Sequence, residues 1–208
     1  WSRGVAGIAL LVLGLVPAGG AFIFHAWTAD LPSADSLLSR VSGDATKIYD
    51  RDGELLFEVL DPRAGRRTRV RLEDLPPHVT QAVIAVEDAG FYHHPGVDVR
   101  GVARAAWHLV RERRIVSGGS TITQQLARLV MLGDAERRER SVRRKTREIV
   151  LAVELTRRYD KDTILELYLN EVNFGQLAYG IEAAARTYFG KPVRELDLAE
   201  SALLAGLI

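Results

Sequence analysis

Two polar runs decide what kind of fold this chain needs: Glu87-Asp88-Ala89-Gly90-Phe91-Tyr92-His93-His94-Pro95-Gly96 and Gly118-Gly119-Ser120-Thr121-Ile122-Thr123-Gln124-Gln125. The first places a carboxylate pair at the end of an apolar helical pattern, beside aromatic and histidine side chains. The second is a glycine hinge leading into a helix whose first turn carries mostly hydroxyl and amide groups. A core needs none of these polar groups, whereas a site for a sugar or a phosphate needs most of them.

Outward from these runs, the pattern beyond Leu75 is helical. Pro76-Pro77 opens a helix that ends at Glu87, because proline is tolerated in a first helical turn. Thr121 and Gln124 form a capping box, as do Asp197 and Glu200. The remaining expected helices are about Val99–Arg113, Ala135–Tyr159, one capped by Asp162 that runs through Asn170, and one marked by Ile181 and Tyr188.

The segment before the helices is short and mixed. Residues 30–45 are rich in Ser, Asp and Pro and predict a linker. Residues 46–72 predict a small β region. In it, Thr46 to Val59 form a hairpin around Asp52-Gly53, and Arg67 to Leu72 alternate with period two as a third strand.

The amino-terminal part carries a long uncharged stretch. No Asp, Glu, Lys or Arg occurs from Gly4 to Ala29, and about 20 apolar residues suffice for a helix to cross a bilayer. Trp27 sits where an interfacial aromatic residue would, and Arg3 favours a cytoplasmic amino terminus. We expect an uncleaved transmembrane anchor over residues 1–29. A signal peptide cleaved near Pro17–Ala21 is the alternative.

Composition limits the function classes further. The chain has no cysteine, which excludes disulfides and thiolate metal sites. The net charge of +1 argues against a protein that is a polycation throughout. His93 and His94 lack partners at metal-binding spacing, so hydrogen-bonding roles are favoured and no metal site is predicted.

Two carboxylates, Glu87 and Glu148, are candidate catalytic groups. Glu87 follows the apolar stripe of Val79 and Val83, and an apolar surrounding suits a carboxylate to act as a general base near neutral pH. A helix cap or an ion pair is the alternative, which spacing alone leaves open.

The segment Arg137–Arg147 is strongly basic. Arg140, Arg144 and Glu148 are four residues apart and should share a helix face, with Lys145 beside them. Ion pairs along a helix account for one Lys or Arg per Glu, and this segment holds more Lys and Arg residues than that. The excess predicts an anionic partner, such as a diphosphate, lipid headgroups or nucleic acid. A solvated face explains it equally well.

The second run could bind an anion or sugar hydroxyls, because a helix amino terminus exposes free N–H groups. Plain capping would use one or two of its side chains and leave the amides of Gln124 and Gln125 without a role. The candidate residues are Gly119, Ser120, Thr121, Thr123, Gln124 and Gln125.

Five motifs, in order, resemble those of the peptidoglycan glycosyltransferases, glycosyltransferase family 51, most closely the amino-terminal module of class A penicillin-binding proteins. The resemblance covers about Thr46 to Ile208. The motifs are Glu87-Asp88-x-x-Phe91-x-x-His94-x-Gly96, Gly119-Ser120-Thr121-x-Thr123-Gln124-Gln125, Arg144-Lys145-x-x-Glu148, Lys161-x-x-Ile164-Leu165-x-x-Tyr168-Leu169-Asn170 and Tyr188-Phe189-Gly190-Lys191.

This resemblance implies a mainly α-helical, lysozyme-like lobe over residues 73–208, beside the small β-hairpin region and the transmembrane helix. It implies an enzyme that polymerises lipid II into glycan strands, with inversion at the anomeric carbon and release of undecaprenyl diphosphate. It also implies a divalent cation, Mg²⁺ or Mn²⁺, as a candidate companion of that diphosphate, although the sequence shows no dedicated metal site.

The resemblance also implies roles for single residues. Glu87 is the expected general base and Glu148 a second acid near the diphosphate. Arg144 and Lys145, with Arg140 beside them, are expected to neutralise the leaving diphosphate. Asp88, Phe91 and His94 should shape and hold the catalytic loop. Asn170 and the polar residues of the second motif complete the expected substrate-binding set.

The expected setting is the bacterial plasma membrane, with one span and an extracytoplasmic catalytic domain. Expected partners are lipid II, the growing glycan strand, membrane lipid and other cell-wall synthesis proteins, and no nucleic acid. The transpeptidase motifs of class A proteins do not occur. The hairpin at Thr46 to Val59 resembles the strands that lead into the glycosyltransferase module of bifunctional class A proteins, so we expect the chain to be the front part of a longer, bifunctional protein, with a monofunctional enzyme as the alternative. The competing hypotheses are a muramidase-like hydrolase and a membrane-anchored anion-binding module.

Overall fold

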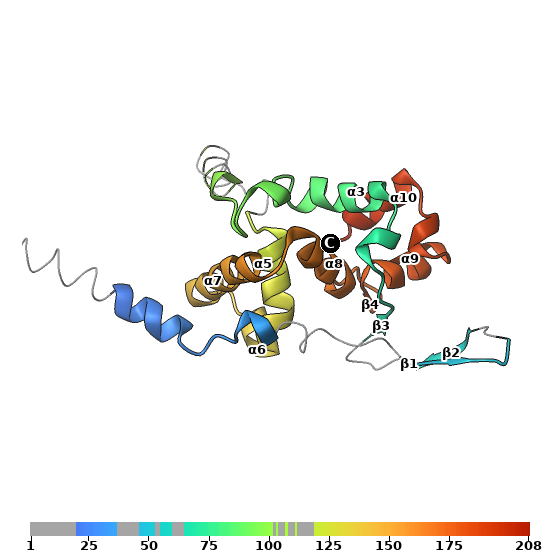
Figure 1. Cartoon of the computed structure of the whole chain (residues 1–208), viewed down its shortest axis with the longest axis horizontal. Coiled ribbons are helices and arrows are strands. Elements are labelled where there is room, and N and C mark those ends of the chain that lie inside the picture. The colour runs from blue at the N-terminus through green and yellow to red at the C-terminus, as the bar shows by residue number, and fades with distance from the viewer. Residues whose placement is uncertain are drawn as a thin grey trace, which may run out of the picture.

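The computed structural model describes residues 20–36, 46–52, 55–59, 65–101, 103, 107, 111 and 119–208. The described part is mainly helical, as expected. Figure 1 shows the labelled helices gathered in one body, with the blue helix of residues 20–28 and the hairpin of β1 (Thr46–Tyr49) and β2 (Leu55–Val59) extending away from it. The β1–β2 hairpin is antiparallel, which confirms that prediction.

The predicted third strand is wrong in extent and in pairing. Strand β3 covers only Arg66–Arg67 and pairs in parallel with β4 (Ala178–Tyr179), far along the chain. The segment after β3 lies along helix α8 (Lys161–Glu171), because Asn170 binds both the N–H and the C=O of Val70, each at 2.9 Å. The period-two pattern therefore reflects packing on a helix and not membership of the hairpin sheet.

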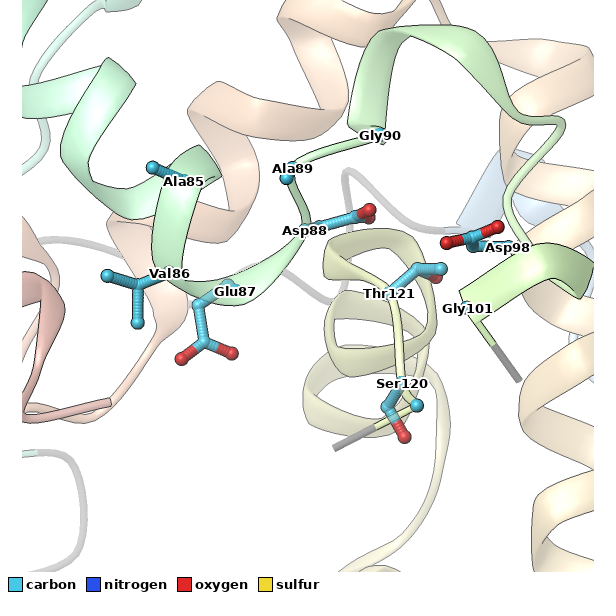
Figure 2. A pocket seen from close by; sticks show the side chains of 11 residues that line it. Ala85, Val86, Glu87, Asp88, Ala89, Gly90, Asp98, Gly101, Ser120 and Thr121 are labelled. Atoms are coloured by element: carbon cyan, nitrogen blue, oxygen red, sulfur yellow. The ribbon is translucent and has the colours of Figure 1, made fainter. Parts of the chain in front are cut away.

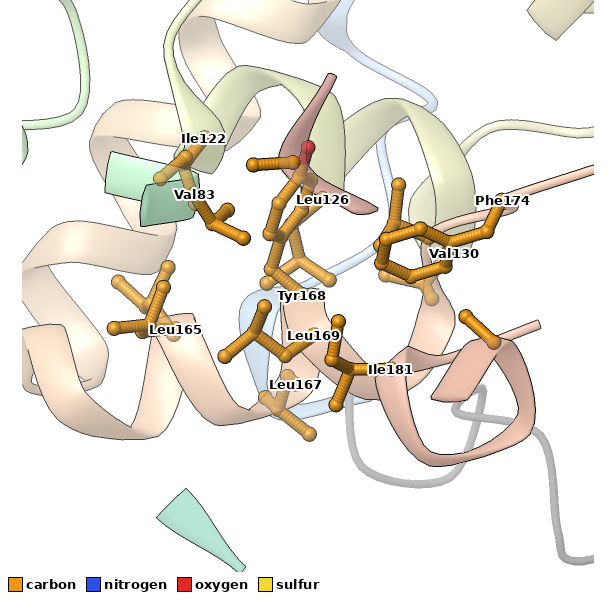
Figure 3. Packing of buried hydrophobic residues seen from close by; sticks show 14 of the residues in the cluster. Val83, Ile122, Leu126, Val130, Leu165, Leu167, Tyr168, Leu169, Phe174 and Ile181 are labelled. Atoms are coloured by element: carbon orange, nitrogen blue, oxygen red, sulfur yellow. The ribbon is translucent and has the colours of Figure 1, made fainter. Parts of the chain in front are cut away.

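The core of the described part forms where helices from several parts of the chain meet. Helix α5 (Ile122–Leu126) packs against α7 (Val142–Arg158) and α8, and α3 (Pro77–Glu87) packs against α10 (Leu198–Ala205), which follows α9 (Ile181–Phe189). Figure 3 shows buried side chains of α5 and α8, including Leu126, Tyr168 and Leu169, in one cluster. A short π turn, η4 (Ala127–Met131), continues α5. The chain thus fixes α5, which carries the second motif, from several sides.

Both predicted capping boxes are confirmed, whereas the long helix over Ala135–Tyr159 is wrong. The structure has α6 (Asp134–Arg138), a non-helical link and then α7. Ser141 ends the link, since its Oγ accepts a hydrogen bond from the Arg144 N–H at 3.1 Å and caps α7.

Two other predicted helices need comment. Helix α8 is capped by Asp160 and not by Asp162, because the Asp160 carboxylate accepts from the Thr163 N–H at 2.7 Å. Asp162 instead accepts a hydrogen bond from the Tyr92 hydroxyl at 2.9 Å. Of the helix expected over Val99–Arg113, the described residues are helical, and the others lie outside the described part.

The amino-terminal segment contacts the helical body from Trp27 onward, whereas residues 20–26 are exposed. Residues 20–28 are helical, and no helix among the described residues is long and apolar enough to cross a membrane. Most of the predicted anchor lies outside those residues. After this helix, Ala34 is buried, and its carbonyl accepts a hydrogen bond from the Tyr159 hydroxyl at 3.1 Å. The described part of the predicted linker is therefore docked along α7.

Candidate active site

Glu87 is the last residue of α3, at the edge of a cleft. Its Oε2 accepts a hydrogen bond from Gln125 Nε2 at 2.6 Å. The cleft has a volume of about 170 Å³ and is lined by the end of α3, the loop after it and residues 119–121. Figure 2 shows the Glu87 and Asp88 carboxylates pointing in different directions. The adjacent acids thus face different partners.

Asp88 connects the first motif to the second. Its buried carboxylate lies 2.9 and 3.0 Å from His94 Nε2 and accepts the Ile122 N–H at 3.1 Å. Phe91 is fully buried, and its ring meets that of His94 edge-on. Asp88 thereby satisfies a free N–H at the start of α5, as a carboxylate does well at a helix amino terminus. These contacts hold the loop that follows Glu87.

The start of α5 uses its polar side chains on protein partners. Thr121 Oγ1 donates to the Gly96 carbonyl at 2.6 Å and accepts from the Gln124 N–H at 3.2 Å. Thr123 and Gln124 are buried, and Thr123 Oγ1 and Gln124 Nε2 lack hydrogen-bond partners among the described residues. Capping therefore accounts for Thr121 and for Gln124 Oε1, which accepts from the Thr121 N–H at 3.3 Å, but not for the rest of the motif.

Lys145 joins the second motif to the third. Its Nζ lies 2.7 Å from Ser120 Oγ, 3.0 Å from Gln124 Oε1 and 3.3 Å from Glu148 Oε2. Burial, followed by the charges of Arg144 and Arg128, lowers the pKa of Lys145 to about 8. Burial therefore disfavours the charged form of Lys145, and its three oxygen contacts at the edge of the second motif hold the ammonium in place.

Glu148 is buried beneath the cations of α7. Its Oε1 pairs with Arg144 Nη1 and its Oε2 with Lys145, and it is 2% exposed. Arg144 also donates to the Glu139 carbonyl. Both carboxylate oxygens face protein cations, and the described residues contain no group of three or more His, Cys, Asp or Glu that could hold a metal ion. The site as built suits an anionic ligand.

Two predicted site residues are not part of this arrangement. Arg140 lies in the link before α7 and is exposed, so the argument that it shares a helix face with Arg144 and Glu148 is wrong. Asn170 has both ends of its amide bound to the backbone of Val70. The structure gives Asn170 a role in holding the chain on α8, and its predicted role in binding substrate stays a prediction.

Tyr168 belongs to the fourth motif, but sequence reasoning gave it no role at the site. This fully buried residue of α8 donates its hydroxyl to Gln125 Oε1 at 3.1 Å. Burial, followed by the charge of Glu87, raises the pKa of Tyr168. The sequence does hold a clue, since Tyr168 lies on the apolar face of Ile164 and Leu165, where a hydroxyl requires a partner.

The chain is similar in sequence to known proteins. Residues 52–208 match the family model described as "Transglycosylase". The chain belongs to the transglycosylase family. The family that the resemblance implied is therefore shown over residues 52–208.

Several curated relatives of this transglycosylase carry the name "Penicillin-binding protein 1A". The identity is 42% over 193 residues with that of Pseudomonas aeruginosa, 45% over 178 with that of Aquifex aeolicus and 43% over 200 with that of Haemophilus influenzae. These alignments cover 93%, 86% and 96% of this chain but 22%, 24% and 21% of the relatives. The chain spans under a quarter of their length.

Proposed function

We propose that this transglycosylase is a peptidoglycan glycosyltransferase. It joins lipid II units into a glycan strand, inverts the anomeric carbon and releases undecaprenyl diphosphate. One observation carries the proposal: the start of α5 is bound by the carboxylate of Glu87 through Gln125 and by the ammonium of Lys145 through Gln124. A base and a cation held against one rigid element are what a transfer with an anionic leaving group requires.

Glu87 is the proposed general base. It takes the proton of the acceptor's 4-hydroxyl as that oxygen bonds to the anomeric carbon of the donor. The bond from the anomeric carbon to the diphosphate breaks at the same time, and its electron pair stays on the leaving group. No acid is needed to protonate a diphosphate, so positive charge is the remaining requirement.

Lys145 and Arg144 are proposed to supply that charge. Lys145 is held by Ser120 and Gln124, and Arg144 is held by Glu148 and the Glu139 carbonyl. Glu148 then acts by positioning both cations. Because both carboxylate oxygens of Glu148 contact these cations, Glu148 is not proposed to bind a metal ion. The predicted divalent cation would arrive on the diphosphate, and its requirement is tested by adding EDTA.

The proposed setting is the outer face of the bacterial plasma membrane, where both lipid-linked substrates are found. A single amino-terminal anchor with a cytoplasmic start would keep the site there. Residues 27–35 support this proposal, because they contact α7, the helix that carries Arg144 and Lys145, and Tyr159 at its end. Membership of a longer bifunctional protein and contact with other cell-wall proteins belong to the same proposal.

The direct test incubates the membrane-embedded protein with labelled lipid II and separates the products on a gel. The proposal predicts a ladder of glycan polymers and release of undecaprenyl diphosphate. A hydrolase would instead shorten added glycan strands and leave lipid II intact. A module that only binds anions would hold anionic vesicles in a salt-dependent manner and make no product.

A further inference from the structure

We infer that Tyr168 is a positioning residue that fixes the Glu87 carboxylate through Gln125. The inference rests on the proposed function for its kinetic consequence and deepens it. The three side chains form one line of hydrogen bonds, from Tyr168 Oη to Gln125 Oε1 at 3.1 Å and from Gln125 Nε2 to Glu87 Oε2 at 2.6 Å.

The direction of this line is set by its buried end. Tyr168 is fully buried, so its hydroxyl proton cannot turn to water and goes to Gln125 Oε1. An amide whose oxygen faces Tyr168 must present its N–H group to Glu87. An ionised carboxylate only accepts hydrogen bonds, so it matches this orientation and rejects the flipped amide.

The consequence for Glu87 is a choice between its two oxygens. Gln125 is the one hydrogen-bond donor to this carboxylate among the described residues, and it occupies Oε2. The other oxygen, Oε1, is left to take the proton of the acceptor hydroxyl. Tyr168 thereby determines, from the core, which oxygen is the base and where its lone pairs point.

The position of Tyr168 makes it a rigid reference. Its ring packs in the core beside Leu126 and Leu169 (Figure 3), so the hydroxyl moves only if α8 moves relative to α5. Glu87, by contrast, stands at the end of α3 and has a half-exposed side chain. Through these hydrogen bonds, the rigid core restricts the orientation of the Glu87 carboxylate at the edge of the cleft.

Kinetics with lipid II provide the first test. Tyr168→Phe removes the hydroxyl and keeps the ring, and we expect kcat to fall about three- to tenfold, the cost of one lost hydrogen bond, with KM nearly unchanged. Gln125→Ala should lower kcat as well, and Tyr168→Phe in that background should have little further effect. Equal kcat for Tyr168→Phe and the unmodified protein, or losses that multiply in the double variant, would overturn the inference.

The matched control is Tyr188→Phe. The Tyr188 hydroxyl also donates one hydrogen bond, to the Phe174 carbonyl at 2.7 Å, away from Glu87. This variant should lose stability comparable to that lost by Tyr168→Phe while keeping its kcat. An equal fall of kcat in both variants would show that loss of any such hydroxyl is enough, and would overturn the assignment.

A second measurement does not depend on activity. The free energy of unfolding is measured for Tyr168→Phe, Glu87→Gln and the double variant. The inference predicts that the two losses are not additive, because both changes act on the Gln125 amide. Additive losses would overturn the inference that Tyr168 acts on Glu87 through Gln125. Non-additive losses, found together with an unmodified protein that makes no polymer, would support the line of hydrogen bonds and refute the proposed function.

Discussion

Gln124 and Gln125 are neighbours in α5, yet their amides bind groups of opposite charge. Gln124 Oε1 accepts from the Lys145 ammonium at 3.0 Å, and Gln125 Nε2 donates to the Glu87 carboxylate at 2.6 Å. Two adjacent residues of one helix therefore set the relation between the proposed base and the proposed cation.

The Lys145 ammonium should give this transglycosylase an alkaline limit. Its pKa is lowered from 10.5 to about 8, mainly by burial. A lysine with a lowered pKa loses its positive charge at a lower pH than an ordinary lysine. The kcat/KM with lipid II should therefore fall as the pH rises through about 8. The Lys145→Arg variant keeps its positive charge to far higher pH, so its kcat/KM should begin to fall at a higher pH. A fall at the same pH in both proteins would exclude Lys145 as its cause.

Asp88 should stabilise the loop behind the site. Asp88→Asn places an N–H₂ group where the carboxylate now accepts from His94 and from the Ile122 N–H. The loss in free energy of unfolding should be about 1–3 kcal/mol, since a buried donor is left unmatched. The control is Asp74→Asn, whose exposed pair with Arg71 should cost less than about 0.5 kcal/mol. Equal effects in denaturant titrations would contradict this role for Asp88.

Arg147 should hold the amino-terminal segment on helix α7. This buried guanidinium donates to the Trp27 carbonyl at 2.7 Å and pairs with Asp30. Its Nε lies 2.6 Å from Glu136 Oε1, although the N–H is not aligned for a hydrogen bond. Hydrogen bonds to charged groups are each worth about 1.5–3 kcal/mol, so Arg147→Met should release the segment.

Limited proteolysis measures that release. Cleavage near Asp30 should become faster in Arg147→Met than in the unmodified protein. Arg157→Met is the matched control, because Arg157 lies on the same helix with an exposed side chain. Unchanged cleavage in Arg147→Met would show that other contacts, such as the Tyr159 hydroxyl with Ala34, suffice to hold the segment.

Local chemistry made part of this structure predictable. The capping box of Thr121 and Gln124 and the end of α3 at Glu87 follow from residues three or four positions apart. The break between α6 and α7 did not follow. Its local residues permit a helix, and the break is fixed by the Ser141 cap and by the bond from Arg144 to the Glu139 carbonyl.

Long-range contacts account for the rest. Arg66–Arg67 pair with Ala178–Tyr179, and no pattern within either segment identifies the other. The site shows the same division. The motifs identified Glu87, Lys145 and Glu148 as candidates, but the link from Tyr168 to Gln125 crosses from α8 to α5 and needed the structure.

Glu87 is the proposed base of a lipid II polymerase, and the Glu87→Gln variant provides the decisive measurement. The substitution keeps size and polarity, so the protein should fold and bind lipid II. Its polymerisation rate should fall by about 10²–10⁴, the usual contribution of a general base. Glu154→Gln, at an exposed position of α7, should polymerise normally. A polymer ladder from Glu87→Gln at the rate of the unmodified protein would contradict the account.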